Sequence, residues 1–196
     1  MRTIGVFNLI SLDGVMQSPH PDGDAREGFA RGGWAGPYQD EVLQKVGSEG
    51  ARGESALLLG RRTYENFAKV WPHMPADNPF TKIMNGFRKY VASRTLTGPL
   101  GWTNSELLEG DAVGALRALK KTRGPNLTVL GSGELVQALL ATDLIDELIL
   151  PIHPLVLGKG RRLFPQDGAA AEFELRGTKT STTGVIIATY GRRGSA

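Results

Sequence analysis

The sequence predicts an α/β fold in which a mostly parallel central sheet carries flanking helices and ends in a C-terminal antiparallel hairpin. Short apolar, β-rich segments alternate along the chain with segments of helical spacing, an order typical of a parallel sheet covered on both faces. The last two β-rich segments, 172–180 and 184–191, are joined by a short Ser/Thr/Gly connection, which predicts the hairpin. The length suits one domain, and we expect a single domain over 1–196.

The first third of the chain predicts two strands separated by a long loop and a helix. Residues 2–10 alternate and are rich in β-forming residues, which predicts the first strand. The segment 11–36 is rich in Gly, Pro and Asp, and such long loops in compact domains are often functional. A helix is expected over 37–49, with Pro37 near its first turn. The apolar run 55–60 ends in glycine and predicts a buried parallel strand.

The middle of the chain continues the alternation of helices and strands. Helical spacing of apolar residues predicts a helix over 60–70, and a shorter helix is expected over 79–87. The segment 89–96 contains the next strand, and a weaker strand lies at 100–103 or 105–108.

The last helices come before the C-terminal hairpin. Residues 111–121 have the spacing of a helix. The segment 128–156 then predicts, in order, a strand, a Gly-Ser-Gly turn, a helix, a loop and a strand.

Composition excludes several classes of protein. The chain has no cysteine, which excludes disulfides, thiolate zinc sites, cysteine nucleophiles and iron–sulfur clusters, and fits a cytoplasmic protein. No apolar window is long enough for a membrane span, and the short N-terminal apolar stretch does not resemble a signal peptide. The net charge of +3 is too small to indicate nucleic-acid binding. The three histidines show no metal-binding spacing, so no metal is expected.

The first candidate binding segment is Gly60-Arg61-Arg62-Thr63, which follows a predicted strand and opens a helix. Glycine lets the backbone approach a ligand closely, and the N–H groups at a helix N-terminus attract anions. The two arginines and the threonine hydroxyl would add bonds to phosphate. The alternative is a plain helix start with two solvated arginines.

The second candidate segment is Ser93-Arg94, directly after the strand within 89–96. This pair suits the ribose 2′-phosphate and adenine of NADP, because the planar guanidinium matches phosphate oxygens. The alternative is an ordinary polar loop.

The third candidate segment comprises the five residues between the strand at 128 and the following helix, namely Gly131, Ser132, Gly133, Glu134 and Leu135. Small residues in a tight turn before a helix make a phosphate-binding arrangement, although Val136 departs from the full G-x-G-x-x-G pattern. The alternative is a turn that needs glycine for its geometry alone. All three segments follow predicted parallel strands, and ligands bind at that sheet edge, so together they favour a dinucleotide site.

Four stretches of the chain resemble a known family. These are IGVFNLISLDG at 4–14, LLLGRRTYE at 57–65, YVASR at 90–94 and the long stretch from Thr128 to Phe164. They resemble the reductase domain of the bacterial bifunctional riboflavin-biosynthesis deaminase/reductase and the stand-alone proteins grouped with it as dihydrofolate-reductase-like. The resemblance covers about residues 2–191.

The resemblance implies a dihydrofolate-reductase-like fold and an NADPH cofactor. It assigns the G-R-x-T turn to the cofactor phosphates, Ser93-Arg94 to the adenosine side, and the glycine turn to the pyrophosphate and nicotinamide half. It places Asp13 and Gly14 beside the active-site cleft. It places a further group near the substrate side, comprising Pro154, Gly158, Gly160 and Phe164.

Two departures leave the substrate open. The folate enzyme holds its pterin with a carboxylate on the first long helix, where this chain offers Asp40 and Glu41 without a clear alignment. The bifunctional enzyme carries a zinc deaminase domain, for which this chain has neither the length nor the cysteines.

Few side chains are candidates for chemistry, because hydride transfer depends mainly on positioning. Asp13 is the first candidate for a catalytic or substrate-binding group near the reacting centre, and Asp40 is the second candidate for catalysis. Each has a structural alternative, an Asx-turn for Asp13 and a helix start for Asp40. Trp34 is a candidate for stacking on a flat heterocycle, with packing as its alternative. A basic cluster at 159–162 is either a solvated loop or a substrate-phosphate contact.

We therefore expect an NADPH-dependent reductase. By resemblance its substrate is 5-amino-6-(5-phosphoribosylamino)uracil or a related pyrimidine-like or pterin-like heterocycle. Two alternatives remain, namely reduction of dihydrofolate or another pterin, and an NADP-binding module that does not turn over. The resemblance also implies a homodimer, with the C-terminal strands as plausible pairing surfaces.

Overall fold

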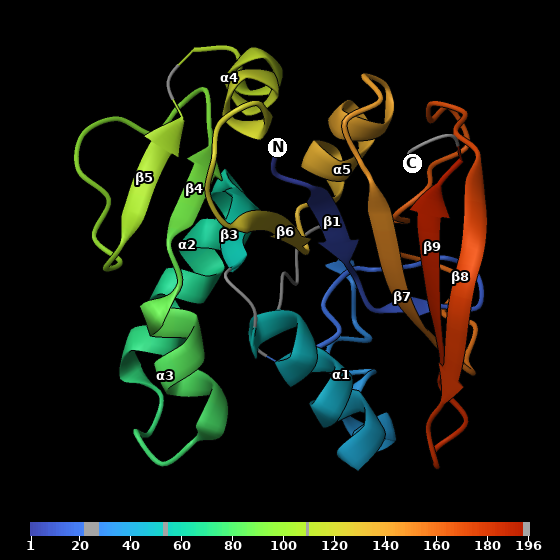
Figure 1. Cartoon of the computed structure of the whole chain (residues 1–196). Coiled ribbons are helices and arrows are strands. Elements are labelled where there is room, and N and C mark those ends of the chain that lie inside the picture. Colours follow the sequence, from blue (N-terminus) through green and yellow to red (C-terminus); the bar gives the residue numbers. More distant parts are fainter. Residues whose placement is uncertain (22–27, 53–54, 109, 194–196) are drawn as a thin grey trace.

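A computed structural model describes residues 1–21, 28–52, 55–108 and 110–193. In this part of the chain the strands form one sheet in the order β5-β4-β3-β6-β1-β7-β9-β8, with β2 beside β7 (Figure 1). The strands are β1 (Ile4–Phe7), β2 (Ile10–Ser11), β3 (Ser55–Gly60), β4 (Lys89–Ala92), β5 (Ser105–Leu108), β6 (Asn126–Leu130), β7 (Glu147–His153), β8 (Phe173–Thr180) and β9 (Ile186–Arg192).

The strands from β1 to β7 pair in parallel, and only β9 and β8 run antiparallel to their neighbours. The predicted fold class, with its C-terminal hairpin, is therefore confirmed. In the hairpin, β9 buries Ile187 and Ala188 between its neighbours, whereas β8, at the lateral edge of the sheet, is exposed along nearly its whole length.

Helices cover both faces of the sheet, and alternate residues of each strand decide which face they meet. Leu58 and Val129 point toward α4 and α5, whereas Leu57 and Leu59 point toward α2 and α3. Helix α1 packs on that second face, against Ile149 and β9. The helices are α1 (Glu41–Arg52), α2 (Arg61–Val70), α3 (Pro79–Gly86), α4 (Ala112–Lys120) and α5 (Gly133–Leu140), with short 3-10 turns η2 (Gly36–Tyr38) and η3 (Trp71–His73).

Two predicted boundaries were wrong. The helix expected over 37–49 begins at Glu41, and Pro37 lies instead in η2. The reason is Asp40, whose carboxylate accepts a hydrogen bond from the Leu43 amide at 2.9 Å and so starts the helix at that point. The strand expected over 2–10 is divided into β1 and β2. Of the two positions expected for the weaker strand, 105–108 is confirmed.

Lys89 is a fully buried lysine at the start of β4. Its ammonium donates to the backbone carbonyls of Asn85, Phe87 and Thr103 at 3.2, 2.8 and 3.0 Å, and lies 4.2 Å from the centre of the Trp102 ring. Burial lowers the pKa of Lys89 to about 8, while the three carbonyls and the ring face favour its charged form. Lys89 therefore ties the end of α3 to the segment that enters β5.

Within the described residues, no helix has the length and apolar character needed to cross a bilayer.

Candidate functional site

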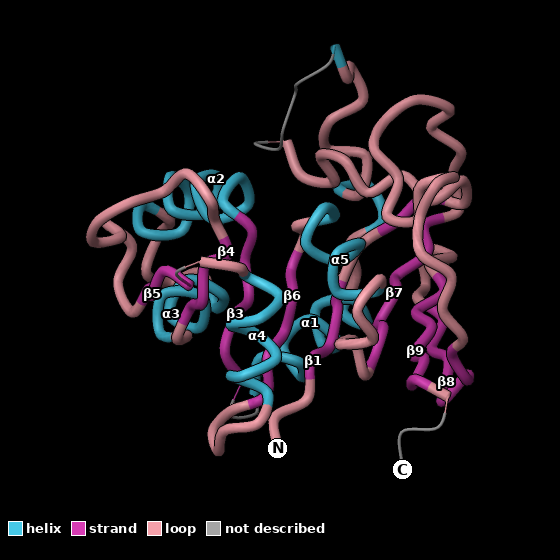
Figure 2. The backbone as a smooth tube through the Cα atoms, turned by 90° about the horizontal axis from the view of Figure 1, so that it is seen from above, coloured by secondary structure: helices cyan, strands magenta, loops and turns pink. Residues whose placement is uncertain are grey.

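The three segments predicted to bind a dinucleotide follow neighbouring strands. Strand β3 lies between β4 and β6, and Gly60 at its end is level with Ala92 at the end of β4. The turn at 60–63, the pair Ser93-Arg94 and the glycine turn at 131–133 therefore share the carboxyl edge of the sheet. Figure 2 shows long loops gathered at the end of the molecule that lies away from both chain termini.

Hydrogen bonds fasten the first and third segments to each other. The Gly60 amide donates to the Ser132 hydroxyl at 2.9 Å, and the Ser132 amide donates to the Thr63 hydroxyl at 3.1 Å. The Ser132 hydroxyl donates in turn to the Leu130 carbonyl at 3.1 Å. Because the Thr63 hydroxyl accepts from Ser132, it keeps its own proton to donate. The first turns of α2 and α5 are thus held side by side.

The glycine turn needs its small residues. Gly131 has a φ of +58°, and a Cβ added there would lie 3.2 Å from the Thr63 side chain. Ser132 also adopts the left-handed conformation, with a φ of 57°. A Cβ on Gly133 would lie 2.7 Å from the Met16 sulfur, so the loop after β2 reaches across this turn. The glycines are therefore required by the geometry of the turn, and this requirement is compatible with a role in binding.

The two helices at this edge differ from the others in how they begin. A side-chain oxygen caps α1, α3 and α4, supplied by Asp40, Asn78 and Asp111. Gly60 and Ser132, the N-cap residues of α2 and α5, make no side-chain cap bond. Uncapped N-terminal N–H groups attract an anion, and here two such helix starts adjoin.

The arginines predicted to bind phosphate have partners on the protein. Arg61 pairs with Glu65 at 3.1 Å. Arg62 pairs with Glu134 at 2.9 Å, and Arg161, from the loop after β7, approaches the same carboxylate oxygen at 3.4 Å. Glu134 therefore holds two guanidinium groups in front of the first turn of α5, where a phosphate would compete for them.

The second segment is less organised for binding. The Ser93 hydroxyl accepts hydrogen bonds from the amides of Thr95 and Leu96 at 3.1 and 2.9 Å and so forms a local turn. Arg94 is exposed. The structure thus places this pair next to the Gly60 turn, and its role toward the 2′-phosphate stays a prediction.

The sequence interpretation missed Asn8. This side chain is 4% exposed, lies in the break between β1 and β2, and donates to the Gly131 carbonyl at 3.1 Å. It therefore supports the glycine turn from the β1 side. The only signal in the sequence is a polar residue that interrupts an otherwise apolar strand.

Asp13 has a loop-fastening role in the structure rather than the predicted catalytic or substrate-binding one. Its carboxylate accepts from the Ser11 hydroxyl at 2.7 Å and from the amides of Leu157 and Gly158 at 3.1 and 2.9 Å. Partial desolvation acts to raise the pKa of Asp13, but these hydrogen bonds outweigh it and lower the pKa to about 2. A carboxylate that is ionised and surrounded by donors cannot supply a proton at neutral pH.

Replacing Asp13 with asparagine is expected to lower the free energy of unfolding by about 1–2 kcal/mol at pH 7. The folded pKa lies below the unfolded value, so this stability is present above about pH 4 and is lost as the pH falls toward about 2. Urea unfolding at a series of pH values would measure it. A difference between wild type and Asp13→Asn that did not shrink below pH 4 would contradict this account.

Asp40 is a structural residue as well. Besides capping α1, its carboxylate accepts from the Thr182 amide and hydroxyl at 2.7 and 2.8 Å, which ties α1 to the β8–β9 turn. The Leu43 amide is the main cause that lowers its pKa. The predicted catalytic role of Asp40 therefore finds no support in its surroundings.

Trp34 is packed rather than open to a ligand. The indole is 7% exposed, donates to the Gln17 carbonyl at 2.7 Å and contacts the His153 ring edge to face, with centroids 5.0 Å apart. The predicted stacking on a substrate would need an exposed ring face, which Trp34 does not present. The packing alternative describes this residue correctly.

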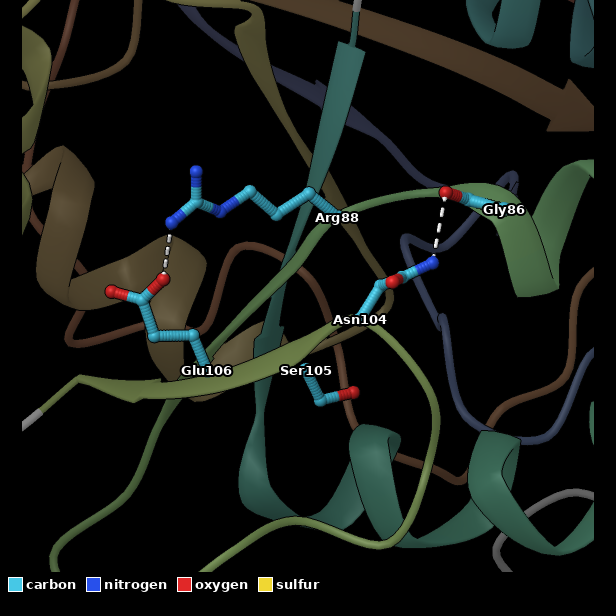
Figure 3. Close-up of a pocket in the computed structure, with 5 residues that line it drawn as sticks. All are labelled: Gly86, Arg88, Asn104, Ser105 and Glu106. Carbon is cyan, nitrogen blue, oxygen red and sulfur yellow. Dashed lines mark hydrogen bonds and ion pairs between the residues drawn. The ribbon is translucent and has the colours of Figure 1, made fainter.

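A surface hollow of about 450 Å³ lies at the amino ends of β4 and β5, away from these turns (Figure 3). Its arginine, Arg88, is paired with Glu106 at 2.6 Å, and Asn104 bonds to the Gly86 carbonyl. The candidate site is therefore the loop-bearing carboxyl edge and not this hollow. Within the described residues, no three His, Asp or Glu side chains gather in a way that could hold a metal ion.

Comparison with known proteins adds a decisive observation to this geometry. Residues 2–187 match the RibD C-terminal domain. The chain belongs to the RibD C-terminal domain family. The resemblance drawn from the sequence motifs is thereby confirmed, over nearly the length that those motifs indicated.

Among curated relatives of this RibD C-terminal domain protein are two uncharacterized proteins of Bacillus subtilis (strain 168). YwjB is 27% identical over 178 residues, 91% of each chain. YyaP is 27% identical over 140 residues, which cover 68% of this chain and 72% of YyaP.

Solved structures share the fold. A putative riboflavin biosynthesis protein from Shewanella sp. PV-4 has a TM-score of 0.70 at 22% identity and covers 97% of this chain and 99% of its own. A pyrimidine reductase-like protein from Corynebacterium diphtheriae has a TM-score of 0.65 at 14% identity, with 97% and 92% covered. Dihydrofolate reductase from Enterococcus faecalis, complexed with NADP(H), has a TM-score of 0.60 at 14% identity, with 97% and 96% covered. The dihydrofolate-reductase-like fold is confirmed.

Proposed function

We propose that this protein is an NADPH-dependent reductase. The observation that carries the proposal is the pair of helix starts at 60–63 and 131–134, which lack side-chain caps and are hydrogen-bonded to each other at the carboxyl edge of a parallel sheet. This is an arrangement for a pyrophosphate. The structurally similar dihydrofolate reductase was solved with NADP(H), which supports the same cofactor here.

The proposed substrate is a small pyrimidine-like or pterin-like heterocycle. We further propose that the protein is a cytoplasmic homodimer and that it does not bind nucleic acid. The names of the Shewanella and Corynebacterium proteins support a pyrimidine of riboflavin biosynthesis, such as 5-amino-6-(5-phosphoribosylamino)uracil. Dihydrofolate is less favoured, because Asp40 is committed to capping α1 and to Thr182.

Calorimetric titration of the protein with NADPH and NADH tests the cofactor. We expect tighter binding of NADPH, since the exposed Arg94 adjoins the Gly60 turn and can pair with a 2′-phosphate. No binding of NADPH would overturn the proposed function. Binding without oxidation across a panel of pyrimidines and pterins would favour the NADP-binding module instead.

Replacing Arg94 with alanine is expected to weaken NADPH binding roughly tenfold while leaving NADH binding nearly unchanged. Titration of both cofactors measures the difference. Arg88→Ala is the matched control, because Arg88 is also exposed but lies at the opposite edge of the sheet. Equal losses for the two cofactors would argue against a 2′-phosphate role for Arg94.

Replacing Glu134 with glutamine is expected to strengthen NADPH binding several-fold, on the order of 1 kcal/mol. The carboxylate competes with phosphate for Arg62 and Arg161, and glutamine keeps the shape while removing the charge. Titration at low ionic strength measures the gain in NADPH affinity. Glu65→Gln, which removes the ion pair of Arg61, serves as the comparison. Weaker binding by Glu134→Gln would show that the carboxylate positions the arginines instead of competing.

A further inference from the structure

His153 is a fully buried histidine at the carboxyl end of β7. It is the register partner of Ser11 in β2. It lies at the carboxyl ends of the parallel strands, where the candidate site is also found. Strand β1 lies between β7 and β6, and Asn8, just after β1, reaches the glycine turn. The imidazole is therefore near the expected cofactor but separate from the residues that would bind its phosphates.

The hydrogen bonds of the ring define its tautomer. Nδ1 lies 3.3 Å from the Ile10 carbonyl and 3.2 Å from the Pro151 carbonyl. Carbonyl oxygens only accept, so Nδ1 carries the proton and Nε2 presents a lone pair. Burial lowers the pKa of His153, which keeps the ring neutral near pH 7.

The Nε2 atom is buried and has no hydrogen-bond partner among the residues that the structure describes. A buried acceptor without a partner destabilises the fold, so its presence calls for a function or an additional group. Around it, the rings of Trp34 and Tyr38 meet the imidazole edge to face, with centroids 5.0 and 5.6 Å away. Such aromatic surroundings suit a flat ring that carries one N–H donor.

We infer that Nε2 of His153 accepts a hydrogen bond from a ring N–H of the heterocyclic substrate. The inference rests on the proposed function and adds a specificity residue to it. Nε2 is enclosed in this structure, Trp34 is held by its bond to Gln17, and Tyr38 is half-buried, so Tyr38 is the ring that has to move for the substrate to reach Nε2. A ring without an N–H donor leaves the acceptor unpaired and is rejected.

The test uses uracil as the probe and dimethyluracil, methylated on both ring nitrogens, as its matched control. Nitrogen NMR of the NADPH-saturated protein, with labelled histidine, follows Nε2 of the three histidines, and His153 is assigned by its loss in a variant. We expect uracil to shift the His153 Nε2 resonance upfield, as hydrogen-bond acceptance does, and dimethyluracil to leave it in place.

Two variants separate binding from folding. His153→Asn keeps a donor where Nδ1 stood but removes the acceptor, and is expected to bind uracil roughly tenfold more weakly with unchanged NADPH affinity. His153→Gln places an amide oxygen near the Nε2 position and is expected to recover much of the loss. Urea midpoints close to wild type would show that both variants fold.

Three results would overturn the inference. One is equal uracil binding by wild type and His153→Asn. Another is an Nε2 resonance already at the hydrogen-bonded position before uracil is added and unmoved by it, which would indicate a buried water as the partner. The third is an Nε2 resonance that millimolar uracil leaves in place. If NADPH binds in these experiments, only the role of His153 fails, whereas absence of NADPH binding would remove the proposed function.

Discussion

Replacing Thr63 with valine is expected to weaken NADPH binding roughly 10- to 100-fold. The Thr63 hydroxyl accepts the Ser132 amide at 3.1 Å and keeps a proton for a phosphate oxygen. Valine has nearly the same shape but removes both functions. It would leave the Ser132 amide without its partner and loosen the contact between the starts of α2 and α5.

Calorimetric titration with NADPH measures this effect, and Thr63→Ser is the matched variant. Serine keeps the hydroxyl, so it should bind NADPH within a few-fold of wild type. The valine variant should stay folded, with a loss of about 1 kcal/mol in the free energy of unfolding. If Thr63→Val and Thr63→Ser bound NADPH equally, the fastening of the two turns would have no part in cofactor binding.

Replacing Lys89 with methionine is expected to destabilise the protein by about 3 kcal/mol, because three buried carbonyls lose a charged donor. For a chain of this length that loss corresponds to a fall in Tm of roughly 6–12 °C. Methionine fills the space of the lysine stem and removes the contact with the Trp102 ring face.

Thermal unfolding measures the change, and Lys82→Met on the exposed side of α3 is the control. The control should shift Tm by no more than a degree or two. Folded Lys89→Met protein should bind NADPH normally, since Lys89 lies at the amino end of β4. A Tm for Lys89→Met that matched the control would show that the carbonyls find other partners.

Much of the site could be predicted because strand ends are marked locally. Glycine after an apolar run indicates a turn at the carboxyl end of a parallel strand, and Gly60 and Gly131 both lie there in the structure. Parallel pairing then brings such ends to one edge whatever the details of packing. The adjacency of the turns at Thr63 and Ser132 was expected on this basis, although their direct bond was not.

The individual roles of polar residues could not be predicted in the same way. Asp13, Asp40 and Trp34 had plausible catalytic or binding roles, and each is occupied by partners distant in sequence, namely Leu157, Thr182 and His153. Conversely, Asn8 and His153 lie within the resembling stretches, but no pattern there indicated a role for either side chain. Whether a carboxylate is free or saturated depends on backbone amides that only the folded chain brings near it.

By itself, the sequence determined the α/β order of elements, the C-terminal hairpin, the three strand-end segments and membership of the RibD C-terminal domain family. These follow from periodicity, turn residues and local motifs, which neighbouring residues encode. The tertiary structure alone decided which polar groups are engaged and which buried atoms, Nε2 of His153 among them, have no partner within the described residues. Those outcomes depend on contacts between residues more than a hundred positions apart, such as His153 with Ile10. Local sequence patterns do not predict such contacts.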